Sequence, residues 1–129
     1  MIAVDTNVLI RFLVRDDAGQ GARAAALVRD NDVWVSKTVI LETEWVLRSL
    51  YGFPSESVMT ALRKLVGLRT MFLEDEAAVA KALAWSGEGL DFADALHLAS
   101  AGNSKRFATF DRKLARQANR VAGLETVSI

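Results

Sequence analysis

Four acidic residues that are distant in the sequence stand where a strand ends or a helix begins: Asp5, Glu42, Asp94 and Asp111. Asp5 closes one short apolar run, and Asp111 follows another. Glu42 lies early in one helical stretch, and Asp94 opens a second. In an open parallel α/β sheet, ligands gather beyond the carboxyl ends of the strands, so these four side chains can converge.

Carboxylates that converge in this way repel one another. Two ionised groups about 4 Å apart cost roughly 4 kcal/mol at an effective dielectric constant near 20, whereas one pKa unit corresponds to about 1.4 kcal/mol. An empty cluster would therefore take up protons. A divalent cation removes this penalty, and an all-oxygen ligand set suits Mg²⁺ or Mn²⁺. The pattern therefore predicts a metal site.

Each of these acids also has a purely structural interpretation. Asp5 and Asp91 occupy positions typical of helix N-caps, and the helix dipole favours Asp94 in a first turn. Asp91 and Asp94 are three residues apart and share a helix face, which favours metal ligation over capping alone. Glu42 and Glu44 point in different directions, so at most one belongs to the site. The pattern does not choose between them.

Other polar residues near these acids have competing interpretations. Thr109 could orient a water molecule or contact a phosphate, or it could form a strand-end hydrogen bond. His97 is predicted to be a packed, hydrogen-bonded helix residue and not a general base. Ser36 is predicted to be an N-cap, because no His/Asp pattern accompanies it as a nucleophile.

The composition limits the class of protein. A length of 129 residues predicts one domain over residues 1–129, and the absence of cysteine excludes disulfides and thiolate metal sites. The single histidine excludes a multi-histidine zinc site. No apolar run is long enough for a membrane span, and the first residues lack the basic start of a signal peptide, so we expect a cytoplasmic protein without a membrane partner.

Basic residues crowd the C-terminal part of the chain, although the net charge is zero. The only acid among them is Asp111. A solvated helix face is the ordinary explanation for such a cluster, but bases beside a predicted metal ligand also suit a substrate with a phosphate backbone. The cluster consists of Lys105, Arg106, Arg112, Lys113, Arg116 and Arg120.

Short apolar runs alternate with helical patterns, which predicts βαβ units and a parallel sheet. Strands are expected at Ile2–Val4, Val33–Val35, Met71–Leu73, Phe107–Thr109 and Thr126–Ser128. Helices are expected at Gln20–Arg29, Thr38–Leu50, Ser55–Val66, Glu76–Trp85, Phe92–Ala101 and Arg112–Asn119. The turn at Pro54 leaves Ser55 as an expected N-cap. We expect some of the remaining large aromatic residues to face a partner, namely Trp34, Phe53, Trp85 and Phe92.

Taken together, the motifs resemble the PIN-domain ribonucleases, and in particular the VapC-type toxins of toxin–antitoxin pairs. The resemblance covers essentially the whole chain, with similar order and spacing, and its motif segments are residues 5–9, Glu42, residues 91–99 and residues 109–111. It implies an α/β fold, with a single PIN-like domain whose central parallel sheet of about five short strands is flanked by helices.

The resemblance also implies roles for individual residues. It prefers Glu42 over Glu44 as the glutamate of the site. The implied metal ligands and catalytic residues, which would hold one or two Mg²⁺ or Mn²⁺ ions, are Asp5, Glu42, Asp94 and Asp111. Residues implied to support the ligands or to position the substrate are Thr6, Asn7, Asp91 and Thr109. Contacts to RNA phosphates would come from Arg112, Lys113 and Arg116.

The implied activity is an endoribonuclease that cleaves RNA phosphodiesters with metal-activated water. A cognate antitoxin protein would inhibit it, and a homodimer is expected. One alternative is a metal-dependent phosphoryl-transfer domain of the receiver or phosphatase type, although Asn7 occupies the second acidic place that such a phosphatase needs. The other alternative is a non-catalytic interaction module whose carboxylates are only helix caps.

Overall fold

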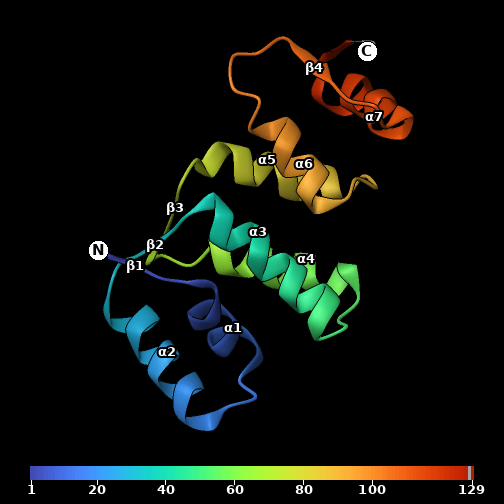
Figure 1. The fold of residues 1–129 in the computed structure, drawn as a ribbon. Coiled ribbons are helices and arrows are strands. Elements are labelled where there is room, and N and C mark those ends of the chain that lie inside the picture. The colour runs from blue at the N-terminus through green and yellow to red at the C-terminus, as the bar shows by residue number, and fades with distance from the viewer. Residues whose placement is uncertain (128) are drawn as a thin grey trace. The chain divides into compact units, whose positions relative to one another are not determined.

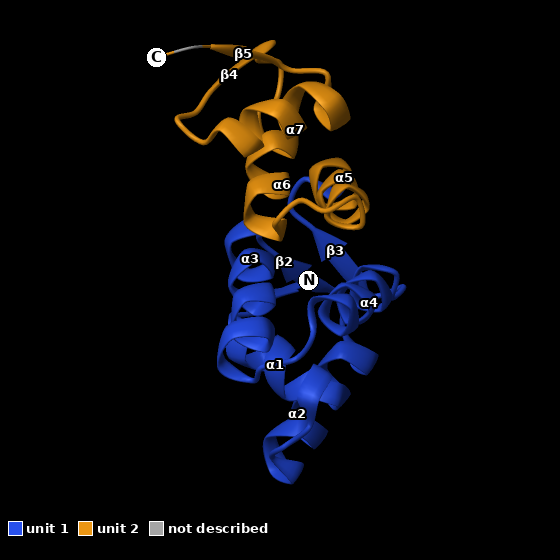
Figure 2. Ribbon diagram, turned by 90° about the vertical axis from the view of Figure 1, so that its right-hand side faces the viewer, with its two compact units in different colours: residues 1–76 blue, residues 77–129 orange. Residues whose placement is uncertain are grey.

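A computed structural model describes residues 1–127 and 129. The chain divides into two compact units, residues 1–76 and residues 77–129, which Figure 2 distinguishes by colour. Figure 1 labels the helices α1 to α7 and the strands β1 to β4, and Figure 2 labels β5. The hydrogen bonds of the described residues group the strands into two parallel sheets, one of three strands and one of two. This confirms the α/β class and the five short parallel strands.

Unit 1 contains a three-stranded sheet with the order β1-β2-β3. Ile2 pairs with Val33, and Val33 pairs with Met71, so β2 is the central strand. Helix α1 packs against α2 and α3, and α4 packs against β3. The elements are β1 (Ile2–Ala3), α1 (Thr6–Val14), α2 (Ala18–Asp30), β2 (Val33–Val35), α3 (Lys37–Trp45), the π-helical turn η1 (Val46–Leu50), α4 (Ser55–Val66) and β3 (Met71–Leu73).

The core of unit 1 follows the period of each element. On β2, Val33 and Val35 are buried while Trp34 between them is exposed, as expected from alternating strand side chains. On α4, the buried side chains recur at three- and four-residue intervals, as an amphipathic helix requires. The buried α4 residues are Val58, Met59, Leu62 and Leu65.

Unit 2 contains three helices and a two-stranded sheet in which Phe107 pairs with Thr126. Helix α7 packs against α6 and against both strands. The elements are α5 (Glu76–Ser86), which begins at the last residue of unit 1, α6 (Phe92–Ala99), β4 (Arg106–Ala108), α7 (Arg112–Ala122) and β5 (Glu125–Val127). The last expected strand ended at Ser128, which lies outside the described residues.

Several sequence predictions differ from the observed elements. Helix α1 was not among the expected helices, because the run Val8, Leu9 and Ile10 is as typical of a buried strand as of a helix. Ser55 does not cap α4: the helix begins at Ser55 itself, and Pro54 occupies the cap position without a side-chain bond. The helix expected over residues 38–50 changes to a π-helical turn at Val46, where Tyr51 N donates to Val46 O.

The unplaced aromatic residues have different environments. Phe92 belongs to the core, whereas Trp34 and Phe53 are exposed. Trp85 is half-buried. Over residues 1–127 and 129, no helix is both long and apolar enough to cross a membrane.

Candidate functional site

In unit 1, the end of β1 leads directly into α1, and this junction carries the first predicted ligand. Asp5 is exposed, and its Oδ1 accepts a hydrogen bond from Val8 N at 3.2 Å, which makes Asp5 the N-cap of α1. The cap requires one oxygen, and a carboxylate has two. Asp5 can therefore cap the helix and still offer Oδ2 to a cation.

The next residue, Thr6, connects this junction to the predicted glutamate. Its side chain is buried, and its hydroxyl donates to Oε1 of Glu42 on α3. Glu42 itself is exposed. A buried hydroxyl has little freedom to reorient, so this hydrogen bond orients the Glu42 carboxylate. Asn7, also predicted near the site, is exposed on the first turn of α1.

The structure distinguishes the two glutamates that the pattern could not. Glu44 is only 3% exposed, and its Oε2 forms an ion pair with Arg48 Nε at 2.7 Å one turn later. Its charge is therefore already compensated inside unit 1. Glu42 is exposed, and among the described residues its carboxylate accepts a hydrogen bond from the hydroxyl of Thr6 and forms no ion pair. Of the two glutamates, Glu42 is the one available to bind a cation.

In unit 2, the start of α6 holds two of the predicted acids. Asp91 is the N-cap, and its Oδ2 accepts from Asp94 N at 3.3 Å. The Asp94 side chain is partly buried, and this burial is the main cause that raises the pKa of its carboxyl above the ordinary value. The negative charges of Asp91 and Asp111 raise this pKa further, while His97 opposes them. Asp94 therefore lies in the field of two like charges.

The segment between β4 and α7 holds the fourth predicted acid. Thr109 Oγ1 accepts from Asp111 N at 3.0 Å, which is the strand-end hydrogen bond considered for this threonine. Asp111 Oδ1 accepts from Leu114 N at 3.1 Å and caps α7. Both interactions fix the backbone of the turn that carries Asp111, and Oδ2 of Asp111 is not needed for the cap.

Two other polar residues also have clear positions. Ser36 caps α3 by accepting from Val39 N, as predicted. The prediction that His97 is packed is wrong, because its side chain is exposed. The core face of α6 includes Ala95, Leu96 and Leu98, and His97 lies instead three residues after Asp94 on the outer face.

The predicted phosphate-binding residues lie on one helix. Arg112, Lys113 and Arg116 are all exposed on α7, whose buried residues are Leu114 and Ala118. They follow Asp111 within the first two turns, so they place positive charge beside a predicted ligand.

The structure brings the predicted ligands together as two pairs. Asp5 and Glu42 are linked through Thr6 in unit 1, and Asp94 and Asp111 interact electrostatically in unit 2. Within neither unit, over the residues that the structure describes, do three aspartate, glutamate or histidine side chains lie close enough to hold one ion. The predicted cluster takes ligands from both units, and it stays a prediction.

The residues nevertheless fit a hard divalent cation in their chemistry. All four candidates are carboxylates, and oxygen ligands of this kind suit Mg²⁺ and Mn²⁺. The carboxylate of Asp94 accepts no hydrogen bond from any residue in the described part of the chain, and Asp5 and Asp111 each use Oδ1 for a cap. Ligand oxygens are therefore available at each of these three aspartates.

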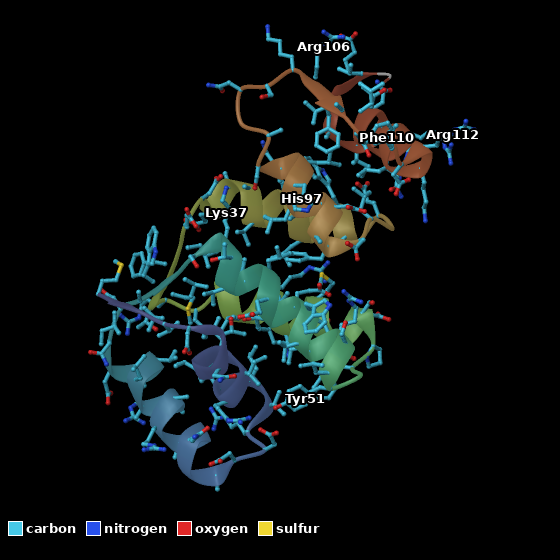
Figure 3. All side chains as sticks on the ribbon, viewed as in Figure 1. Lys37, Tyr51, His97, Arg106, Phe110 and Arg112 are labelled. Atoms are coloured by element: carbon cyan, nitrogen blue, oxygen red, sulfur yellow. The ribbon has the colours of Figure 1, made fainter. Side chains whose placement is uncertain are left out.

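Phe110, which stands between Thr109 and Asp111, was not among the residues predicted to act in the site. Its side chain is 83% exposed. Figure 3 labels it together with Arg112 on the same short segment. The available signal was an aromatic residue close to the basic cluster, two residues before Arg112, a combination that is typical of surfaces that bind single-stranded nucleic acid.

Comparisons with known proteins identify the family. No curated protein and no solved structure matches the chain. The PIN domain family matches residues 2–120, which is most of the 129 residues and includes all four predicted acids. PIN domains are generally metal-dependent nucleases that use ions such as Mg²⁺ or Mn²⁺. The chain belongs to the PIN domain family.

Proposed function

We propose that this chain is a Mg²⁺- or Mn²⁺-dependent endoribonuclease and the toxin of a toxin–antitoxin pair. The observation that carries the proposal is the PIN domain match over residues 2–120, which includes all four predicted acids, and the environment of Asp94 supports it. Burial raises the pKa of the Asp94 carboxyl, the negative charges of Asp91 and Asp111 raise it further, and no lysine or arginine among the described residues forms an ion pair with it. A carboxylate in such surroundings favours a cation.

Asp5, Glu42, Asp94 and Asp111 would hold one or two of these ions. When bound, the metal supplies a Lewis acid that lowers the pKa of a water molecule and neutralises charge on the phosphodiester. Thr6 would keep the Glu42 carboxylate oriented through its hydrogen bond. Asp91 and Asp111 would in addition keep the first turns of α6 and α7 in place as N-caps.

The remaining groups act on the substrate. Arg112, Lys113 and Arg116 would bind phosphates that flank the cleaved bond, because their exposed cationic groups follow Asp111 on α7. The attacking water loses one proton as its oxygen bonds to phosphorus and the P–O bond to the leaving oxygen breaks. A carboxylate oxygen of Asp94 or Asp111 would accept that proton.

The toxin role adds two protein partners, a cognate antitoxin and a second copy of the chain. A groove of about 830 Å³ in unit 1 combines apolar side chains such as Phe12 and Leu65 with polar ones such as Glu56 and Lys64, and it supports an antitoxin segment as its occupant. Exposed apolar residues such as Trp45 and Leu50 support a dimer. Sedimentation of the purified chain as a monomer at micromolar concentration would contradict the dimer.

The test compares three aspartates that share one structural role. Asp5, Asp111 and Asp17 each cap a helix through the carboxylate, but Asp17, the cap of α2, is not a predicted ligand. Asparagine caps helices about as well as aspartate, so each Asp→Asn variant keeps its fold. We expect RNA cleavage in Mg²⁺ to be lost in Asp5→Asn and Asp111→Asn and retained in Asp17→Asn.

The same variants also test the metal and the toxicity. Calorimetry with Mn²⁺ should show stoichiometric binding to the wild-type chain and to Asp17→Asn, and weaker binding to Asp111→Asn. Expression should arrest growth only for variants that cleave RNA. Cleavage at the wild-type rate by Asp5→Asn or Asp111→Asn would refute the assignment of the site.

A further inference from the structure

The turn that carries Phe110 is fixed on both sides. Before it, β4 pairs with β5, so that Ala108 stands opposite Val127. After it, the hydrogen bond from Asp111 N to Thr109 Oγ1 closes the turn, and Asp111 Oδ1 caps α7. The backbone of Phe110 therefore has little freedom, and its ring has only two side-chain torsions. A ring held in this way loses little conformational entropy when it stacks on a ligand.

The ring also borders a cavity with polar groups and a cation. A cavity of about 450 Å³ lies within unit 2 beside Phe110, and its lining includes Arg112 and the two threonines Thr109 and Thr126. Its volume falls in the range of roughly 300–1,000 Å³ that is typical of small-ligand sites. An aromatic face, hydroxyls and a guanidinium are the groups with which proteins bind a single-stranded nucleotide.

We propose that Phe110 and this cavity form a nucleobase subsite, in which the ring stacks on one base of single-stranded RNA next to the cleaved phosphate. Arg112 would contact the phosphate or the base edge of the same nucleotide, because it lines the same cavity. This inference rests on the proposed nuclease function and deepens it. In this proposal Phe110 positions one nucleotide. Helix α7 provides the phosphate contacts and also lines one side of the base site.

The test is a cycle that removes the ring and the base separately. The RNA is a short single strand that spans a cut made by the wild-type chain, together with copies in which each nucleotide in turn lacks its base. Binding is measured by fluorescence anisotropy in Mg²⁺ with the Asp94→Asn variant, which we expect to be inactive. Phe110→Ala and Phe110→Trp are added to this background, and Phe72→Ala, at an exposed aromatic residue of β3, is the matched control.

We expect Phe110→Ala to weaken binding of the intact RNA about tenfold, which corresponds to about 1.4 kcal/mol. Removal of one particular base should weaken binding by a similar factor, and Phe110→Ala should then cause no further loss on that RNA. Phe110→Trp and Phe72→Ala should bind as tightly as the background variant. Unchanged melting temperatures will show that these surface variants fold.

Two results would overturn the subsite. One is a loss of less than twofold in Phe110→Ala, and the other is an equal loss on every RNA that lacks a base. If Asp94→Asn abolishes cleavage while Phe110→Ala binds normally, the nuclease function stands and only the subsite fails. If the wild-type chain neither binds nor cuts RNA in Mg²⁺, the proposed function fails and the subsite fails with it.

Discussion

Replacement of Arg48 by alanine tests why Glu44 is a structural residue and Glu42 is not. Glu44 is 3% exposed, and Arg48 contacts it at 2.7 Å through Nε and at 3.5 Å through Nη2. Removal of the arginine leaves a buried carboxylate without this partner. Loss of one partner of a buried ion pair costs about 3–5 kcal/mol. Because the Arg48 side chain is 36% exposed and admits water, we expect a smaller loss, about 2–3 kcal/mol.

A loss of this size is readily measured by thermal unfolding followed by circular dichroism. For a chain of this length, 1 kcal/mol shifts the melting temperature by about 4 °C, so Arg48→Ala should melt roughly 8–12 °C below wild type. The double variant Glu44→Leu/Arg48→Met should recover most of this loss, because apolar residues of similar size can replace a buried ion pair. Glu42→Ala should cost only about 1 kcal/mol, through the lost hydrogen bond from Thr6.

The two glutamates should also differ in nuclease assays. We expect the Glu44→Leu/Arg48→Met variant to retain Mg²⁺-dependent cleavage and Glu42→Ala to lose it. A melting temperature of Arg48→Ala within 2 °C of wild type would refute the buried-charge argument. If the folded double variant lost cleavage while Glu42→Ala remained active, Glu44 and not Glu42 would be the glutamate of the site.

Three further predictions concern the core, a helix cap and one titrating group. Leu9→Ala should lower the free energy of unfolding by about 2–5 kcal/mol, measured in urea, because Leu9 is fully buried on α1. Asp111→Ala and Asp17→Ala should each lower the free energy of unfolding by about 1 kcal/mol, because each removes a helix cap. Only Asp111→Ala should lower the affinity for Mn²⁺, and an equal loss of affinity in both variants would contradict the site. The hydrogen bond from Arg29 lowers the pKa of Asp30. The stability that this pair contributes is therefore present above the ordinary aspartate pKa and is lost as the pH falls through the folded-state pKa. NMR titration should show that Arg29→Gln returns the pKa of Asp30 to its ordinary value.

The sequence predicted most of the local structure, because local structure depends on periods and caps that a short segment contains. The bounds of β2, β3 and α4 agree with the prediction, and Ser36 caps its helix as expected. The prediction missed α1, since Val8, Leu9 and Ile10 in a row resemble a buried strand as much as a helix. Length and context distinguish these two, and periodicity does not.

The sequence by itself determined which chemical groups are present, because its 16 aspartates and glutamates, one histidine and no cysteine favour a site with oxygen ligands. Tertiary structure decided which group is available for that chemistry. It buried Glu44 in an ion pair with Arg48 and left Glu42 exposed with a hydrogen bond from the Thr6 hydroxyl. It also placed Phe110 on a fixed turn, where its side chain lines a cavity. Burial depends on packing against residues that are distant in the sequence, and so does the hydrogen bond to Glu42 from Thr6, 36 residues away. For this reason the local sequence pattern could not reveal them.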